Sequence, residues 1–590
     1  MMRVCGLAAV LVVGCAGVAR AQVTGIAKAE ASVSAENIRA QVQFISDDLF
    51  EGRYPGLRGG DLAAKYIATQ FALYGLQPAG DNGTYFQQIN FVGMTAKPAE
   101  TTFTLTGKGA PMKLKFADDF VVMNQTLTAV TDVDAPIVFV GYGASAPEYG
   151  WDDYAGVDVK GKVILCIVGD PPSNDPKFFG GDAMTYYGRW TYKFEQAARK
   201  GAVGALIIHR TDLASYGWDV VKNSNSGEKT FLAEDANPPL KAASWIQLEV
   251  AKRIFEASGM TLDGAFDAAG KKGFKAVELP VKLQAHVASE VRKFQSANVV
   301  GMLPGGELCG RRDKEGNLID LAGLCPMPDP DPGQAMLYTA HYDHLGFVPG
   351  MKGDNIYNGA ADNGTGVGML LEMARAWAAE FGGLEYDGPQ VAGDDRCCWK
   401  RKLPHSVIFA AVTAEEQGLL GSEYLGQHPP IPAAQIALDI NYDMLMPVGV
   451  QKEVNVNGAQ RTTFFPQVQA TVKKFGLAIV PDPNPSHGSY YRSDHFSLSR
   501  VGIPAFSVDA GSLYEGHDRA WGEAMEKHFN ENDYHNFSDN FDPKWEFKGD
   551  ANLVRFGMDL GWQVINAPHT VEWVKGDEFE AARKASEVAK

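Results

Sequence analysis

The chain has 590 residues, of which 45% are hydrophobic and 21% charged, a composition that is typical of folded globular proteins and excludes a disordered chain. A chain of this length exceeds what one hydrophobic core supports, so we expect two or more domains. The formal net charge is −17 and the chain has no lysine- and arginine-rich block, which argues against nucleic acid or anionic membrane as a partner.

The first residues have the pattern of an export signal. An early Arg3 precedes an apolar stretch over residues 4–18, and "ARA" at 19–21 forms an A-x-A cleavage pattern. The stretch is shorter than the about 20 apolar residues of a transmembrane span. We therefore predict a signal peptide over residues 1–21 and an exported protein, periplasmic or secreted. Cys15 is an alternative, less well formed lipoprotein processing site.

Removal of such a signal would leave five of the seven cysteines. Cys309 and Cys325 bracket a polar loop, and an oxidising compartment favours a disulfide between them. Cys397 and Cys398 are adjacent in "GDDRCCWK", and their redox state cannot be read from the sequence. Cys166 lies in the apolar run "KVILCIVG", which predicts a buried thiol.

The first 275 residues are predicted to contain two kinds of structure. Within residues 34–77, apolar spacings of three and four predict two helices, "NIRAQVQFISDDLF" and "GGDLAAKYIATQFALYGL". From 118 to 275, short apolar runs such as "APIVFVGYG" and "GALIIHR" alternate with turns, and "WTYKFEQAARKGA" is the one helix among them. This texture predicts a β-rich module with its own core, inserted after residues 22–117.

Strands then alternate with helices over residues 276–567. Strands are predicted at "SANVVGMLPG", "AMLYTAHYDHLG", "HSVIFAAVTAEE", "AQIALDINYDM" and "GIPAFSVDA", and helices at "GVGMLLEMARAWAAEF", "LLGSEYLGQ", "TFFPQVQATVKKFG" and "ANLVRFGMDLGWQVINA". This alternation predicts an α/β domain around a mainly parallel sheet, whose ligand sites lie at the carboxyl ends of the strands. Residues 568–590 form a charged tail that we expect to be exposed.

Histidines and carboxylates directly follow several of these strands. His341 ends one strand, and Asp343 is two residues on, where it can hold the imidazole ring. Asp362 lies in the glycine-rich loop "NGAADNGTGVG", and Glu415 and Glu416 follow the next strand. Taken singly, such residues more often cap a helix or interact with its dipole.

Asp443, at the end of a third strand, and His535, in a loop before the last helix, complete the group. All these side chains are expected at one edge of one sheet, which favours a shared metal centre. Two histidines and three carboxylates suit two zinc ions with one bridging carboxylate, whereas calcium or magnesium would not need the histidines. A bridged ion pair with a free glutamate as general base predicts hydrolysis of an amide.

The motifs "AHYDHLG", "GAADNGTGVG", "TAEEQGLLGS", "NYDM", "RSDHFSLSRVGIPAF" and "YHNFSDNFD" resemble, in this order, those of the co-catalytic dizinc aminopeptidase family. This family includes bacterial leucyl aminopeptidases, aminopeptidase Y and glutamate carboxypeptidase II. The resemblance covers about 280–567 and, more loosely, 34–117, while 118–275 resembles the protease-associated insert of several members. It implies an aminopeptidase that removes N-terminal residues from peptides through a metal-activated water, and the predicted signal peptide makes this an exported enzyme.

The resemblance also implies which residues would hold the zinc ions. His341, Asp362 and Glu416 would bind one ion. Asp362, Asp443 and His535 would bind the other, so that Asp362 bridges the two.

Further roles follow from the same resemblance. Glu415 would be the general acid and base, and Asp343 would orient His341. Tyr490, or the adjacent tyrosine, would help to bind the tetrahedral intermediate. Two histidines match positions that are not ligands in the family: His344 and His495.

Several other functions stay open at this point. A carboxypeptidase or dipeptidase of the glutamate carboxypeptidase II type needs a cationic pocket, for which Arg492 is a candidate. A glutaminyl cyclase uses one zinc ion and usually lacks the insert, and a non-catalytic relative would have lost ligands that are all present here. The chain has no G-x-S-x-G elbow of a serine hydrolase. The preferred substrate residue and the oligomeric state cannot be read from the sequence.

Overall fold

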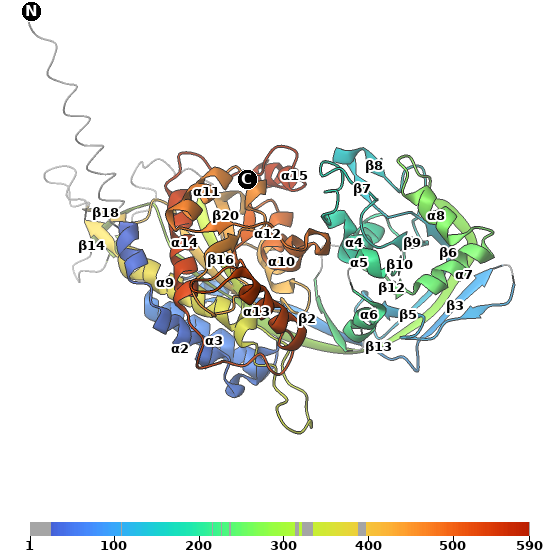
Figure 1. Ribbon diagram of the computed structural model, residues 1–590, viewed down its shortest axis with the longest axis horizontal. Helices are drawn as coiled ribbons and strands as arrows, with labels where there is room; N and C mark the ends of the chain where they lie inside the picture. Colours follow the sequence, from blue (N-terminus) through green and yellow to red (C-terminus); the bar gives the residue numbers. More distant parts are fainter. Residues whose placement is uncertain are drawn as a thin grey trace, which may run out of the picture. The chain divides into compact units, whose positions relative to one another are not determined.

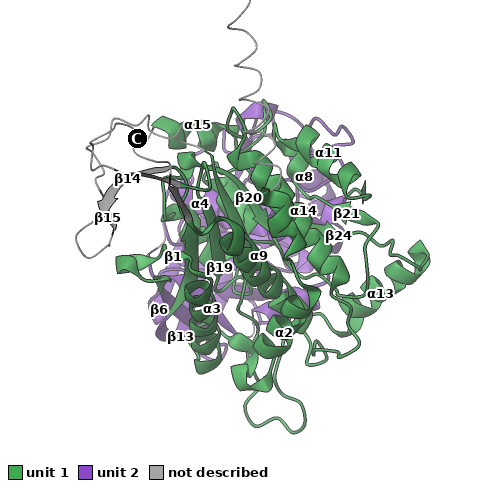
Figure 2. Cartoon of the chain, turned by 90° about the vertical axis from the view of Figure 1, so that its left-hand side faces the viewer, with its two compact units in different colours: residues 1–89, 296–481, 493–590 green, residues 90–295, 482–492 purple. Residues whose placement is uncertain are grey.

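The computed structural model describes residues 25–588, apart from 108, 215, 226, 235–237, 313–317, 321–333 and 387–396. The predicted signal peptide lies outside the described residues, as do the side chains of four cysteines, Cys309, Cys325, Cys397 and Cys398, so these calls stay predictions. The chain divides into two compact units (Figure 2). Unit 1 comprises residues 1–89, 296–481 and 493–590, and unit 2 comprises 90–295 and 482–492.

Unit 1 is built on a mainly parallel sheet. β16 (Ala335–His341), β19 (Val407–Val412), β20 (Ile436–Asn441) and β23 (Ala505–Ser507) run parallel in the order β23–β20–β16–β19, and the end of β13 (Val277–Leu303) pairs antiparallel with β19. Every residue of β16, β19 and β20 is buried, as is usual for parallel strands with both faces covered. The predicted α/β fold with a mainly parallel mixed sheet is confirmed.

Helices cover both faces of this sheet (Figure 1). Four pack on one face: α2 (Ala35–Ile45), α3 (Arg58–Tyr74), α9 (Gly366–Phe381) and α14 (Lys548–Ile565). Two pack on the other: α10 (Leu420–Gln427) and α12 (His495–Arg500). Within β16, Met336 and Tyr338 belong to the first core and Leu337 to the second, because successive side chains of a strand point to opposite faces.

Unit 2 has its own sheet and core. β6 (Val130–Phe139), β9 (Val163–Ile167), β10 (Gly204–Ile208) and β12 (Ala242–Ile246) are parallel neighbours, and β5 (Phe120–Met123) pairs antiparallel with β12. Apolar side chains on the two faces form two clusters. The predicted helix is present as α4 (Trp190–Arg199), but the prediction of a single helix is wrong, because the unit also contains α7 (Leu248–Ala257) and α8 (Leu262–Ala269). Cys166 is a buried free thiol, as predicted. The assignment of this unit as a protease-associated domain stays a prediction.

The C-terminal residues are not the exposed tail that their charge predicted. Three apolar side chains there are at most 5% exposed: Val571, Trp573 and Phe579. The guanidinium of Arg583, on α15 (Glu580–Val588), is 1% exposed and donates to the backbone carbonyls of Ala433 and Ile436. The prediction was wrong because the three buried apolar side chains of this segment are widely spaced in the sequence and form no periodic pattern that would predict burial.

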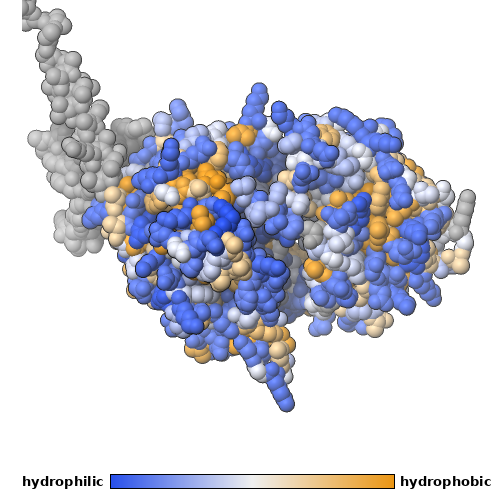
Figure 3. Space-filling model, in the orientation of Figure 1, coloured by the Kyte–Doolittle hydropathy of each residue, from blue (hydrophilic) through white to orange (hydrophobic). Residues whose placement is uncertain are grey.

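The described part of the chain has no helix with both the length and the apolar character of a membrane span. On the face shown in Figure 3, the hydrophobic side chains lie in separate patches among hydrophilic ones. Most of the large apolar side chains are instead in the cores of the two units.

Candidate metal centre

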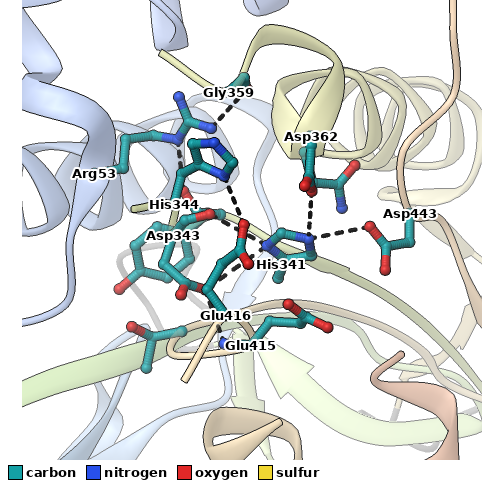
Figure 4. A network of polar contacts seen from close by, with 12 residues as sticks. Arg53, His341, Asp343, His344, Gly359, Asp362, Glu415, Glu416 and Asp443 are labelled. Carbon is teal, nitrogen blue, oxygen red and sulfur yellow. Dashed lines mark hydrogen bonds and ion pairs between the residues drawn. The ribbon is translucent and has the colours of Figure 1, made fainter. Parts of the chain in front are cut away.

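The carboxyl ends of neighbouring parallel strands bring the predicted ligands together in unit 1 (Figure 4). His341 is the last residue of β16, Glu415 and Glu416 follow β19, and Asp443 follows β20. Asp362 comes from the segment that precedes α9. Nε2 of His341 lies 3.3 Å from Oδ1 of Asp362 and 3.0 Å from Oδ1 of Asp443. These three side chains form the first half of the site.

A second half of the site lies around the other carboxylate oxygen of Asp362. Nε2 of His535 is 3.2 Å from Oδ2 of Asp362 and 3.0 Å from Oε2 of Glu416. Oε1 of Glu416 is 2.6 Å from Nδ1 of His344. Asp362 therefore faces a histidine with each of its oxygens, which is the arrangement that a bridging carboxylate requires.

The division of the ligands between the two halves differs from the predicted one. The resemblance grouped His341 with Glu416, whereas the structure groups it with Asp443 and places Glu416 beside His344. The chain turns sharply after β19, where Ala414 has a φ of 56°, and this turn directs Glu416 toward His344 (Figure 4). His344, set aside as a non-ligand in the sequence, thus lies within reach of an ion in the second half.

Acids and imidazoles depend on one another for charge compensation here. Burial acts to raise the pKa of Asp362, but ion pairs with His341 and His535 hold it well below its ordinary value. Burial likewise opposes ionisation of Glu416, whose pKa the charges of His535 and His344 nevertheless lower to about 2. In this state the positive charge comes from protonated histidines. A divalent cation could take the place of their protons and compensate the carboxylates, because a nearby positive charge favours the ionised acid.

The donor atoms fit metal ions. Nδ1 of His344 and Oε1 of Glu416 are buried and 2.6 Å apart, yet they lack the angles of a hydrogen bond. Two atoms that bind the same metal ion are close together without pointing at each other, which is the arrangement of this nitrogen and this oxygen. Imidazole nitrogens combined with carboxylate oxygens form a typical zinc ligand set, so these residues fit zinc.

Asp343 contacts both His341 and the segment that carries Glu415. Nδ1 of His341 donates to the backbone carbonyl of Asp343 at 3.2 Å, while the Asp343 carboxylate is 3.8 Å from the ring. That carboxylate accepts a hydrogen bond from the backbone N–H of Glu415 at 3.1 Å. Burial raises the pKa of Asp343 to about 7. The predicted role of Asp343 in orienting His341 stays a prediction, and these contacts mean that it would involve the backbone carbonyl as well as the carboxylate.

Glu415 differs from Glu416 in its surroundings. Burial raises the pKa of Glu415 well above its ordinary value; His341 acts against this shift, while Asp443 and Glu416 add to it. Glu415 belongs to neither group of candidate ligands, and Figure 4 shows the two glutamates pointing in different directions. Glu415 is thus an acid beside the ligands that is free to hold a proton.

Two residues whose roles the sequence did not reveal hold the ligands in place. The carboxylate of Asp539 accepts hydrogen bonds from the backbone N–H groups of Ala361, at 2.9 Å, and Asp362, at 3.0 Å. The hydroxyl of Ser493 donates to the carboxylate of Asp443. Both lie inside motifs that carry the family resemblance, so their motif membership was the available signal.

Arg53 supports the backbone beneath the ligands. It is fully buried, and Nε donates to the carbonyl of Tyr342 at 2.7 Å. Its Nη atoms donate to the carbonyls of Ile45, Asn358 and Gly359 (Figure 4). Burial lowers the pKa of Arg53 to about 10, and the carboxylates of the site act against this change. The guanidinium is therefore charged at neutral pH and joins the two loops that carry His344 and Asp362.

Replacement of Arg53 by methionine is expected to destabilise unit 1 by about 3–5 kcal/mol, because it leaves several buried carbonyls without donors. Urea unfolding of the metal-free protein measures this loss. Arg58→Met is the control, since Arg58 is largely exposed and pairs with Glu51 at 2.9 Å, a contact worth less than about 1 kcal/mol. Equal unfolding midpoints for the two variants would contradict the supporting role.

Tyr490 and Tyr491 are buried in unit 2, with ring centroids 5.3 Å apart. The metal-ligand candidates all belong to unit 1. A role of Tyr490 toward the reaction intermediate stays a prediction.

An acid that bridges two groups of imidazole and carboxylate donors, at the carboxyl edge of a parallel sheet, is the architecture of a metal-dependent hydrolase. Residues 325–553 match the family model described as Peptidase family M28. Together with the two groups of imidazole and carboxylate donors, this match identifies the protein as a zinc metallopeptidase. The resemblance to the dizinc aminopeptidase family is thereby confirmed.

Solved structures with long alignments include an aminopeptidase from Aneurinibacillus sp. strain AM-1, with 20% identity, coverage of 91% of this chain and 96% of that chain, and a TM-score of 0.46. The zinc aminopeptidase BSAP from Bacillus subtilis has 16% identity, 90% and 94% coverage, and a TM-score of 0.37. A Peptidase M28 precursor from Shewanella amazonensis SB2B has 16% identity, 94% and 98% coverage, and a TM-score of 0.39. No curated protein matches the chain.

Proposed function

We propose that the protein is an exported dizinc aminopeptidase that releases N-terminal residues from peptides. The observation that carries this proposal is the excess of acid around the metal centre. The carboxylates whose charges act on one another there are Asp343, Asp362, Glu415, Glu416, Asp443 and Asp494. Six ionised carboxylates would exceed the four positive charges of two divalent ions. Burial raises the pKa values of Asp343, Glu415 and Asp494, and a nearby ammonium group would favour their ionised forms. The site therefore favours the free ammonium group of a peptide's N-terminus.

The distribution of cationic side chains also favours an aminopeptidase over a carboxypeptidase. Among the described residues, no ion pair joins Asp362, Glu416 or Asp443 to a lysine or arginine. Arg53 lies nearby, but its donors are committed to backbone carbonyls. A carboxypeptidase needs a cation that is available to the terminal carboxylate of its substrate, and the described residues of the metal centre supply none.

The chain's own residues would divide the work of peptide hydrolysis. Zinc bound here would supply Lewis acidity toward the substrate carbonyl and lower the pKa of water. His341, Asp443, Glu416 and His535 would hold the ions on either side of Asp362. The carboxylate of Glu415 would take up the proton lost by water and pass it to the departing amine.

A peptide assay tests the direction of trimming. The purified protein is incubated with Leu-Gly-Gly-Phe whose C-terminus is amidated, and with the same peptide bearing an N-acetyl group and a free C-terminus. An aminopeptidase removes leucine from the first peptide and leaves the second intact, as followed by mass spectrometry. Loss of phenylalanine from the acetylated peptide alone would establish a carboxypeptidase instead.

Two further readouts address the remaining alternatives. Loss of ammonia from a peptide with N-terminal glutamine, without release of a residue, would establish a glutaminyl cyclase. Export is tested by expressing the full chain with its first 21 residues and determining the N-terminus of the mature protein. A mature chain that starts at Gln22 supports the predicted cleavage site, and one that starts at a lipid-modified Cys15 would replace it.

A further inference from the structure

Unit 2 contains a cavity of about 240 Å³, and all its lining residues belong to that unit. It is formed by the start of α4, by α6 (Trp218–Ser224), by β11 (Glu228–Leu232) and by β12, together with the segment 482–492. Three cationic side chains line it: Arg189, Lys229 and Arg492. Its lining residues include no aspartate or glutamate.

Arg189 is a cation without a partner for its charge among the described residues. Within the described chain its side chain forms no hydrogen bond or ion pair, and its Nε is buried without an acceptor. Burial, and then the charge of Arg492, lower the pKa of Arg189 to about 10. A buried guanidinium beside a second guanidinium is unfavourable unless an anion compensates both.

The other two cations also lack a carboxylate partner among the lining residues. Nε of Arg492 donates to the backbone carbonyl of His487 at 3.0 Å, and no ion pair occupies the rest of its guanidinium among the described residues. The side chain of Lys229 has no carboxylate partner there, and burial lowers its pKa. The cavity therefore offers several N–H donors and concentrated positive charge, and no carboxylate among its lining residues compensates that charge.

The walls of the cavity are aromatic. Trp190, Trp245 and Tyr216 line it, and Trp245 is 3% exposed. An inorganic anion would satisfy the cations but would make no apolar contact with the ring surfaces that line the cavity. A volume below the 300–1,000 Å³ that is usual for drug-sized ligands suits an occupant of about one amino-acid residue.

We propose that this cavity is a binding site for a small organic carboxylate that carries an apolar group. Arg189 and Arg492 would bind the carboxylate, since guanidinium groups pair with it through two parallel hydrogen bonds. Trp190, Trp245 and Tyr216 would contact the apolar part. The C-terminal residue of a peptide and a single N-blocked amino acid share this chemistry. The proposal does not depend on the proposed aminopeptidase activity.

Binding is tested by titration calorimetry on the full-length Glu415→Gln variant, which prevents turnover of the probe. The probes are N-acetyl-leucine, its uncharged analogue N-acetyl-leucinamide, inorganic phosphate, and an N-acetylated tetrapeptide with C-terminal leucine. We expect saturable binding of N-acetyl-leucine, with at least 10-fold weaker binding of the amide and of phosphate. Binding of the tetrapeptide as tight as that of N-acetyl-leucine identifies a peptide terminus as the source, and weaker binding identifies the single amino acid.

Two substitutions assign the binding to this cavity. Arg189→Met and Arg492→Met, each added to Glu415→Gln, are expected to weaken N-acetyl-leucine binding at least 10-fold. Because Arg492 is exposed, its replacement keeps the test valid if Arg189→Met does not fold. Arg199→Met is the control, since Arg199 lies on the same α4 helix, pairs with Glu195 at 3.3 Å and does not line the cavity. The absence of saturable binding, equal binding of the amide, or unchanged binding by Arg492→Met would overturn the proposal.

Discussion

Replacement of Glu415 by glutamine is expected to lower kcat by about 10²–10⁴-fold, because it removes proton transfer to and from the reacting groups. Glutamine keeps the size of the side chain, and the backbone N–H that donates to Asp343 is unchanged. KM should therefore change little. Steady-state kinetics with leucine p-nitroanilide measures both constants.

The metal content separates this effect from a loss of zinc. Glu415 lies in neither group of candidate ligands, so the variant should retain as much zinc as the wild type by elemental analysis. Glu423→Gln, on helix α10, is the matched control and should retain wild-type kcat. A Glu415→Gln enzyme with normal turnover would show that another group moves the proton.

Much of the fold could be predicted because unit 1 follows regular patterns. Its buried strands read as short apolar runs and its helices as periodic ones, so the parallel sheet and the edge that carries the ligands were both predictable. Helix α13 (Arg519–Asn532) was not predicted. It has only Gly522 and Phe529 buried, so it lacks the apolar face by which helices are recognised.

The candidate ligands could be predicted from the sequence, but their pairing could not. Strand ends determine which side chains meet, whereas the partner of each depends on local backbone geometry such as the turn at Ala414. Gly359 illustrates the same limit. With a φ of 56°, it passes so close to His344 that an added Cβ would lie 2.5 Å from the ring, and no spacing rule reveals this contact.

Long-range support was equally invisible in the sequence. Arg53 lies 289 residues before the carbonyl of Tyr342 that it contacts, and a lone arginine after a helix is ordinarily read as a surface residue. Its burial follows from the need to satisfy carbonyls in loops that are themselves shaped to present ligands. Such residues become recognisable only when the loops are placed in three dimensions.

Replacement of Asp362 by alanine is expected to have the largest effect on metal binding, because this carboxylate faces both halves of the site. Loss of a bridging ligand weakens both ions, so zinc content should fall from about two ions per chain to less than one, and peptidase activity by at least about 10³-fold. Elemental analysis after dialysis against zinc-containing buffer measures the first quantity. Asp354→Ala is the control, since Asp354 is an exposed carboxylate in the preceding loop.

The grouping of the ligands predicts a graded pattern among single variants. Asp443→Ala removes a donor from the half that contains His341, and Glu416→Ala removes one from the half that contains His344. Each should retain about one ion per chain, because the other half keeps its donors and Asp362. The double variant with His341→Ala and Asp443→Ala should still retain about one ion per chain, because both substitutions affect the same half. The double variant with His341→Ala and Glu416→Ala should retain none, because each half loses a donor. The opposite result, with one ion left after His341→Ala and Glu416→Ala, would restore the pairing that the family resemblance implied.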